Sequence, residues 1–318
     1  MVPLSASEHP TKGEAVNLAS PALPRPSSWL LTRDVVVLGV IWGSSVVLQR
    51  MALAEMTPLP LMTLRLLLAL VYFVPLLPRI VHGLSISRRD LQAVLIVGAL
   101  NPGASGVYLA FALAYASSGL VALLTSLGPL FAALLAMILL REPALRRGQV
   151  AALVIAFGGV ALLIATRSTG LQVNIVGDAR GALFGLIVPL ALALSAVYAR
   201  RFLGEIDATV AVAGQVVGGM LFVVPIQFIR AEPLHIFQLS AGAWLAVALS
   251  GVIGLSASFV LLLRIIRNRG LTAAMLNLYV VPATAAALGV FALGETITPA
   301  MFVGAALVFG GVFLFTRS

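Results

Sequence analysis

The side chain best suited to bind a charged ligand is Arg65, which lies in a long apolar stretch seven residues after Pro58. A helix rises about 1.5 Å per residue, so Arg65 is expected roughly 10 Å along a helix that begins at Pro58. Within a membrane, a charge at such a depth costs about 2.5 kcal/mol or more unless it is paired or hydrated. We interpret Arg65 as a candidate anchor for a carboxylate or phosphate. The alternative is a structural arginine that hydrogen-bonds helix ends.

Other polar and aromatic residues lie in apolar stretches at helical spacing. Trp42 and Gln49 are seven residues apart, and Asn101, Tyr108 and Tyr115 repeat this spacing, so each set is expected on one helix face. A polar stripe surrounded by lipid must face protein or water. These side chains are therefore candidates to line a substrate cavity, the alternative being hydrogen bonds between helices. Four further candidates in the second half of the chain are Tyr198, Gln215, Asn277 and Tyr279.

The residue types predict neither catalysis nor a metal site. The chain has no cysteine, no His-Glu-x-x-His, no Gly-x-Ser-x-Gly and no cluster of carboxylates within its apolar stretches. We therefore expect that the protein is not an enzyme, and that it binds no metal and no cofactor. The histidines lie outside the apolar stretches, at His9, His82 and His235.

The composition is typical of a protein embedded in lipid. Hydrophobic residues make up 61% of the 318 residues and charged residues only 10%, and the mean hydropathy is +1.10. So few charges cannot cover a soluble surface of this size. The fold class predicted is an all-α integral membrane protein. Its expected partners are the lipid bilayer and a small-molecule substrate, and it is expected to be a monomer or a homodimer.

The net charge of +9 reflects membrane topology, because the arginines stand singly or in short groups between apolar runs. We therefore expect no nucleic-acid binding. With the N-terminus placed in the cytoplasm, fifteen Lys and Arg residues fall on the cytoplasmic side and four on the other. This bias predicts that both termini are cytoplasmic. Residues 1–32 are polar at their start and rich in Pro and Ser, and are expected to form a disordered cytoplasmic tail.

Ten stretches are long and apolar enough to be transmembrane helices, since a span needs about 20 residues. Short connections such as 55–57 allow only antiparallel neighbours. The expected spans are 34–52, 58–79, 90–114, 118–140, 147–166, 177–200, 208–229, 241–263, 270–293 and 297–316.

The two halves of the chain repeat one another. Each half, 33–168 and 175–318, holds five expected spans, so the second is predicted to be inverted relative to the first. Matching residues lie about 150 to 153 positions apart, and include the pairs Gly103 and Gly254, and Ser105 and Ser256. Four matching residues are expected to act as hinges or structural supports: Pro129 with Pro282, and Glu142 with Glu295.

The chain resembles the drug/metabolite transporter superfamily, specifically its ten-helix EamA-type members, over residues 34–316. The resemblance rests on Trp42-Gly43, on Pro58 followed by Arg65, and on the two hinges Leu140-Arg141-Glu142-Pro143 and Leu293-Gly294-Glu295. One departure is Ala151, where the second copy has Gly304.

This resemblance implies a transporter of amino acids, other small metabolites, drugs or nucleotide-linked compounds. We expect a secondary transporter in a bacterial inner membrane that exports small metabolites, amino acids or related compounds, by alternating access. A multidrug or nucleotide-linked carrier, or a channel-like facilitator, is the alternative. No acidic residue lies deep in an expected span, which favours a facilitator or an exchanger over a carrier coupled to protons or sodium.

Overall fold

The computed structural model consists of helices joined by turns and loops in the part of the chain that it describes, with no strand there. The described residues are 28–83, 87–166, 168, 170–171, 179–203, 206–269, 274 and 276–317. The prediction of an all-α fold is confirmed for these residues. Most of the predicted N-terminal tail and the expected beginnings of the sixth and ninth spans lie outside them.

The helices follow the expected order of spans. In the first half they are α1 (Ser28–Ala52), α2 (Pro58–Val71), η1 (Val74–Leu76), α3 (Leu77–Gly83), α4 (Arg88–Gly98), η2 (Ala99–Ala104), α5 (Ser105–Tyr115), α6 (Ser118–Thr125), α7 (Gly128–Leu139) and α8 (Arg147–Ala165). In the second half they are α9 (Ala179–Phe202), α10 (Ala208–Arg230), α11 (Ala241–Gly251), η3 (Val252–Ala257), α12 (Ser258–Arg269), α14 (Asn277–Leu293) and α15 (Pro299–Arg317).

Eight helical segments among the described residues are long and apolar enough to cross a membrane. A ninth is added if α2 and the helical segment 74–82 form one span; the two are bent by 41° at the break between Val71 and Val74. α14 has 17 described residues, which is shorter than a full span. The number of spans that the helices themselves support is therefore eight or nine, and ten remains a prediction.

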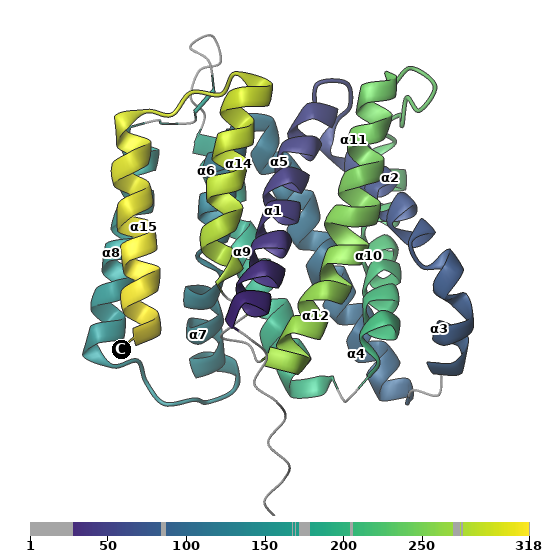
Figure 1. Ribbon diagram of the computed structural model, residues 1–318, viewed down its shortest axis with the longest axis horizontal. Coiled ribbons are helices and arrows are strands. Elements are labelled where there is room, and N and C mark those ends of the chain that lie inside the picture. The colour runs from purple at the N-terminus through teal and green to yellow at the C-terminus, as the bar shows by residue number, and fades with distance from the viewer. Residues whose placement is uncertain are drawn as a thin grey trace, which may run out of the picture.

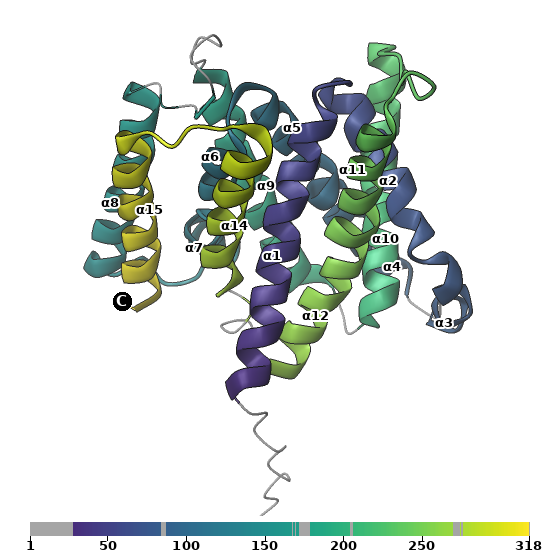
Figure 2. The same ribbon diagram turned by 45° about the horizontal axis from the view of Figure 1, so that its top comes forward.

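The long helices stand side by side in one bundle (Figures 1 and 2). α1 packs between α14 and α11, while α8 and α15 pack against each other at one edge and α3 lies at the opposite edge. α1 begins and α15 ends at the same end of the bundle, where α4 and α8 also begin. We call this end the basic end, because arginines cluster at these helix termini: Arg33, Arg88, Arg147 and Arg317.

Large apolar side chains cover much of the outside of the bundle. Phe291 is 88% exposed and Phe228 79% exposed, and many leucines and valines are exposed on the outer helix faces. Such a continuous apolar exterior is not found on soluble monomers. The buried core includes one cluster around Leu113 and Leu124 and a second around Leu66 and Val216. The outer surface is thus suited to lipid.

Two helices are interrupted at matching positions in the two halves. α4 is joined to α5 through η2, and α11 to α12 through η3, both π-helical segments of six residues. In η2, Pro102 has no N–H to donate and Asn101 has extended backbone (φ −149°, ψ 111°), so the regular ladder is broken. The path α4–η2–α5 leads away from the basic end and the path α11–η3–α12 leads toward it (Figure 1). π-helical turns are frequent at functional sites.

Candidate functional site

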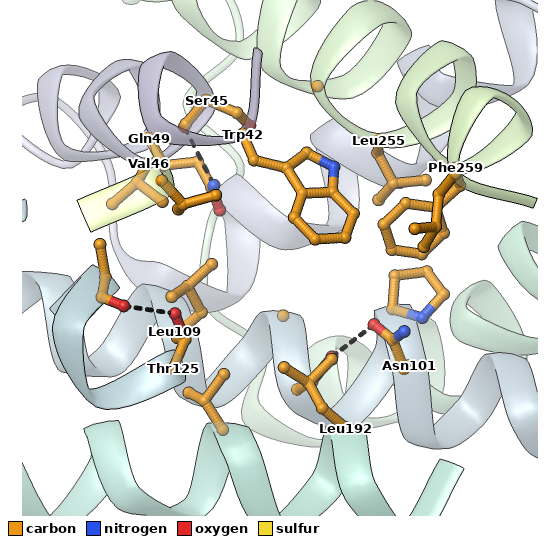
Figure 3. A pocket seen from close by; sticks show the side chains of 18 of the residues that line it. Trp42, Ser45, Val46, Gln49, Asn101, Leu109, Thr125, Leu192, Leu255 and Phe259 are labelled. Carbon is orange, nitrogen blue, oxygen red and sulfur yellow. Dashed lines mark hydrogen bonds between the residues drawn. The ribbon is translucent and has the colours of Figure 1, made fainter. Parts of the chain in front are cut away.

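A cavity of about 170 Å³ lies in the middle of the bundle, beside both interrupted helices. Its walls come from both halves of the chain. Figure 3 shows Trp42, Val46 and Gln49 of α1 facing Asn101, Leu109 and Thr125, with Leu255 and Phe259 closing one side. Most of the lining is apolar, and its polar members are Trp42, Ser45, Gln49, Arg65, Asn101, Ser105, Thr125 and Ser126.

Arg65 supplies the one ionisable side chain of this lining. It projects from α2 and is only 6% exposed. Its Nε donates to the Ser250 carbonyl oxygen at 3.2 Å, and its Nη2 to Ser45 Oγ at the long distance of 3.5 Å. No Asp or Glu among the described residues forms an ion pair with it. The guanidinium is therefore a buried positive charge that an anionic ligand could neutralise.

Trp42 forms an apolar wall whose orientation is fixed. Its Nε1 donates to Ser258 Oγ at 2.8 Å, and Ser258 Oγ in turn donates to the Gly254 carbonyl oxygen at 2.8 Å. The indole also packs edge-on against Phe259, with ring centroids 5.8 Å apart. Because α1, η3 and α12 all hold this ring, it offers a rigid aromatic surface to a ligand.

Gln49 brings an unused hydrogen-bond acceptor to the cavity. It is 1% exposed, and its Nε2 donates to the Ser45 carbonyl oxygen at 3.1 Å. Its Oε1 is buried and has no partner. Buried acceptors are nearly always paired, so one without a partner calls for an explanation such as a missing ligand or water. Gln49 and Arg65 both contact Ser45, which places the acceptor and the cation near each other.

The polar groups at the opposite wall already have partners. Asn101 Oδ1 accepts from Ser105 Oγ at 2.9 Å, and Thr125 Oγ1 donates to the Ala122 carbonyl oxygen at 2.7 Å. Of the residues expected from sequence, the cavity thus unites Trp42, Gln49, Arg65 and Asn101.

Sequence reasoning missed several lining residues, for different reasons. Ser45 lies between Trp42 and Gln49 on the same helix face, so its spacing carried a usable signal. Phe259 occupies the position in the second half that matches Tyr108. Thr125 has no distinguishing spacing and is brought to the site only by the packing of α6.

Tyr108 and Tyr115 do not line the cavity. Both rings pack against Phe184 of α9 at 6.2 Å, and the Arg180 guanidinium carbon lies 4.6 Å from the centre of the Tyr115 ring. The seven-residue spacing from Asn101 assumed an unbroken helix. The π-helical segment and the extended backbone at Asn101 turn α5 relative to α4, so the expected common face does not exist.

The candidates of the second half also lie outside the cavity lining. Tyr198 packs on Phe202 and Tyr279 on Phe309, with ring centroids 4.6 Å and 5.7 Å apart. Asn277 is buried, and its Nδ2 has no partner. The buried residue Gln215 has its backbone against Gly98, at the crossing of α10 and α4.

The paired glutamates have different partners. Glu295 is 8% exposed, and its carboxylate accepts from the Ser118 N–H at 2.9 Å and from Ser118 Oγ at 3.0 Å, so it caps the start of α6. Glu142 forms an ion pair with Arg200 at 2.7 Å near the surface. The matching prolines also differ, since Pro129 lies in the first turn of α7 and Pro282 inside α14.

A second, larger cavity of about 480 Å³ lies at the end of the bundle opposite the basic end. It is lined by Arg50, Leu171 and Glu295, among others. The Arg50 Nη1 donates to the Leu113 carbonyl oxygen at 2.7 Å, so this cation is already engaged. The central cavity is the better candidate because its described lining holds Arg65 without an acidic residue, whereas Glu295 lines the second cavity together with Arg50. Among the described residues, no group of three or more His, Asp or Glu could hold a metal ion.

Comparison with known proteins agrees with this architecture. The model of the EamA-like transporter family matches residues 34–165 and 179–317. A solved structure titled "Crystal structure of protein" is similar, with a TM-score of 0.56 and 21% identity, and the alignment covers 91% of this chain and 98% of that chain. At this identity the likeness concerns the fold alone. No curated protein matches the chain significantly.

Proposed function

Because the chain belongs to the EamA-like transporter family and is thus a multi-pass membrane transporter, we propose that it is a secondary transporter that exports small metabolites, amino acids or related compounds. The central cavity is its substrate site. The observation that carries this proposal is the buried Arg65, which faces the cavity without a carboxylate partner among the described residues. A substrate carboxylate would satisfy it.

The position of the cavity fits transport by alternating access. Trp42, Arg65 and Asn101 come from the first matched region, and Leu192 and Phe259 from the second. A site between two repeats near the middle of the membrane can be opened to either side when one half moves against the other.

The second half is proposed to be an inverted copy of the first, giving ten spans in all. The opposite directions of α4–η2–α5 and α11–η3–α12 support this proposal, as do the equal lengths of η2 and η3. The two spans beyond the eight long helical segments would then be the bent helix α2–η1–α3 and the helix that contains α14. The basic end is proposed to face the cytoplasm, because cytoplasmic loops carry an excess of Lys and Arg.

The size of the cavity favours small metabolites over multidrug or nucleotide-linked cargo. An engineered protein cavity of about 150 Å³ holds one benzene molecule. At about 170 Å³, the central cavity has room for a group of similar size. A nucleotide-linked compound would need a much larger space.

An efflux assay tests the proposal. Proteoliposomes are loaded with a mixture of amino acids, hydroxy acids, oxo acids and nucleosides, and the released compounds are identified by mass spectrometry. We expect at least one small carboxylate to leave faster than from protein-free vesicles, and R65Q to abolish this release while R65K retains part of it. T63V is the matched control, because Thr63 is a buried residue of α2 that does not line the cavity. If no compound leaves faster than from protein-free vesicles, the proposal is wrong.

A further inference from the structure

We infer that the substrate is an apolar 2-hydroxy carboxylate: a monoanion with a hydroxyl group beside the carboxylate and a body of about one ring. This inference rests on the proposed function and names the substrate class of the same cavity. Three features of the lining carry it: the charge balance, the single unpaired acceptor, and the apolar walls.

The charge balance favours a ligand with one negative charge and no positive charge. Arg65 is the one ionisable side chain of the lining. None of the described acidic residues lines the cavity; they are Asp34, Glu55, Asp90, Glu142, Asp207, Glu232 and Glu295. A carboxylate would bring the site to neutrality. An amino acid would also bring an ammonium group, for which the described lining offers no carboxylate, and its charge would lie close to the Arg65 guanidinium.

The unpaired acceptor specifies a hydrogen-bond donor beside the carboxylate. Among the fully buried side-chain polar atoms of the described residues that lack a partner, Gln49 Oε1 is the one that belongs to the cavity lining. Arg65 Nη2 contacts Ser45 Oγ, and Gln49 Nε2 contacts the Ser45 carbonyl oxygen. The donor and the carboxylate must therefore be close together on the ligand. A hydroxyl group supplies one donor for this one acceptor, whereas an ammonium group carries three.

The remaining walls define the rest of the ligand. Trp42 and Phe259 present aromatic surfaces, and Leu109, Leu192 and Leu255 complete an apolar enclosure. An apolar cavity of about 150 Å³ binds benzene, so a cavity of about 170 Å³ suits a ligand with one ring and a short acid side chain. The acid group would lie beside Ser45, where Arg65 and Gln49 meet.

Four compounds that differ in single groups test the inference: 3-phenyllactate, phenylalanine, 3-phenylpropanoate and 2-phenylethanol. Each is measured for efflux from proteoliposomes at equal concentration. We expect 3-phenyllactate to be moved about tenfold better than phenylalanine, because the ammonium group adds a positive charge beside Arg65 that no carboxylate of the described lining balances. We expect it to be moved several-fold better than 3-phenylpropanoate, which lacks the hydroxyl donor for Gln49 Oε1. 2-Phenylethanol, which lacks the carboxylate, should not compete with 3-phenyllactate.

Two variants assign the preference to named groups. Q49L removes the acceptor, and should reduce the ratio of 3-phenyllactate efflux to 3-phenylpropanoate efflux to about one. T63V removes a buried hydroxyl group that also lacks a partner but does not line the cavity, and should change neither rate. Unfolding of Q49L would abolish the efflux of both compounds. Loss of the preference with 3-phenylpropanoate efflux still present therefore cannot be caused by unfolding.

The outcomes separate this inference from the proposed function. Phenylalanine moved as well as 3-phenyllactate would overturn the inference and leave a transporter of amino acids. If none of the four compounds moves while mixture-loaded vesicles release another compound, the inference alone is wrong. If vesicles release no compound at all, the proposed function is wrong as well.

Discussion

Replacing Glu295 should loosen the contact between the α14–α15 loop and the beginning of α6. The Glu295 carboxylate accepts from the N–H and the Oγ of Ser118, which is completely buried. In E295A both donors of the buried Ser118 lose their acceptor. In E295Q an amide oxygen remains in place of the carboxylate, and it can still accept a hydrogen bond.

The expected magnitudes follow from the number and charge of these bonds. A buried donor left without a partner costs about 1–3 kcal/mol, so two such donors make E295A less stable by about 2–6 kcal/mol. E295Q loses the charge assistance and the interaction with the α6 dipole, which together amount to about 1–2 kcal/mol. S118A keeps the backbone bond and removes only the hydroxyl donor, so the carboxylate retains one partner and a loss of about 1–2 kcal/mol is expected.

Unfolding by SDS in mixed micelles, followed by tryptophan fluorescence, measures these differences. E142Q is the matched control from the corresponding position of the first half. Glu142 pairs with Arg200 near the surface, where its side chain is 37% exposed, so its loss should cost about 0–1 kcal/mol. If E295Q is as stable as wild type, or if E142Q costs more than E295A, Glu295 does not act as the cap described here.

Two further predictions concern stability. A Cβ added to Gly98 would clash with the Gln215 backbone, where neither helix can yield easily, so G98A should reduce the unfolding free energy by about 1–3 kcal/mol or more. G158A is the matched control: nothing lies within 4 Å of its added Cβ, so it should be neutral in the same SDS titration. Burial alone would raise the pKa of Asp207, but hydrogen bonds from Arg79 and from the Thr209 N–H outweigh it and hold this pKa below its usual value. The stabilisation is therefore present above the unfolded pKa of about 4 and is lost as pH falls through the lower folded pKa. Wild type but not D207N should lose stability below about pH 4, and equal pH profiles would contradict this assignment.

Much of the fold follows from local sequence. Hydropathy predicts the helices, and Pro102 predicts the interruption of the third span, since proline has no N–H to donate. Arg65, Trp42 and Gln49 could be recognised because a charge and polar groups in apolar helices need a protein or water environment. That they line one cavity could also be predicted, because it requires only that the helix faces carrying them point toward the interior of the bundle.

Other features depend on contacts distant in sequence. The interruption η3 contains no proline, and only its alignment with Gly103 and Ser105 of the first half hints at it. The partner of Glu295 is Ser118, 177 residues away, so the hinge could be identified but its contact could not. Tyr108 lies outside the cavity lining although it is seven residues from Asn101, because spacing within a helix is meaningful only while the helix is continuous.

Alternating access of the central cavity is the claim on which the account depends, and cysteine labelling tests it directly. The chain has no cysteine, so T125C carries a single thiol in the cavity lining. An impermeant thiol reagent is applied to vesicles of either orientation, with S87C and Q238C, both at exposed positions, as controls for the two ends of the bundle. Labelling of T125C from each side, slowed on both sides by a transported substrate, is the predicted result. Labelling from one side only, or labelling that substrate does not slow, would contradict the account.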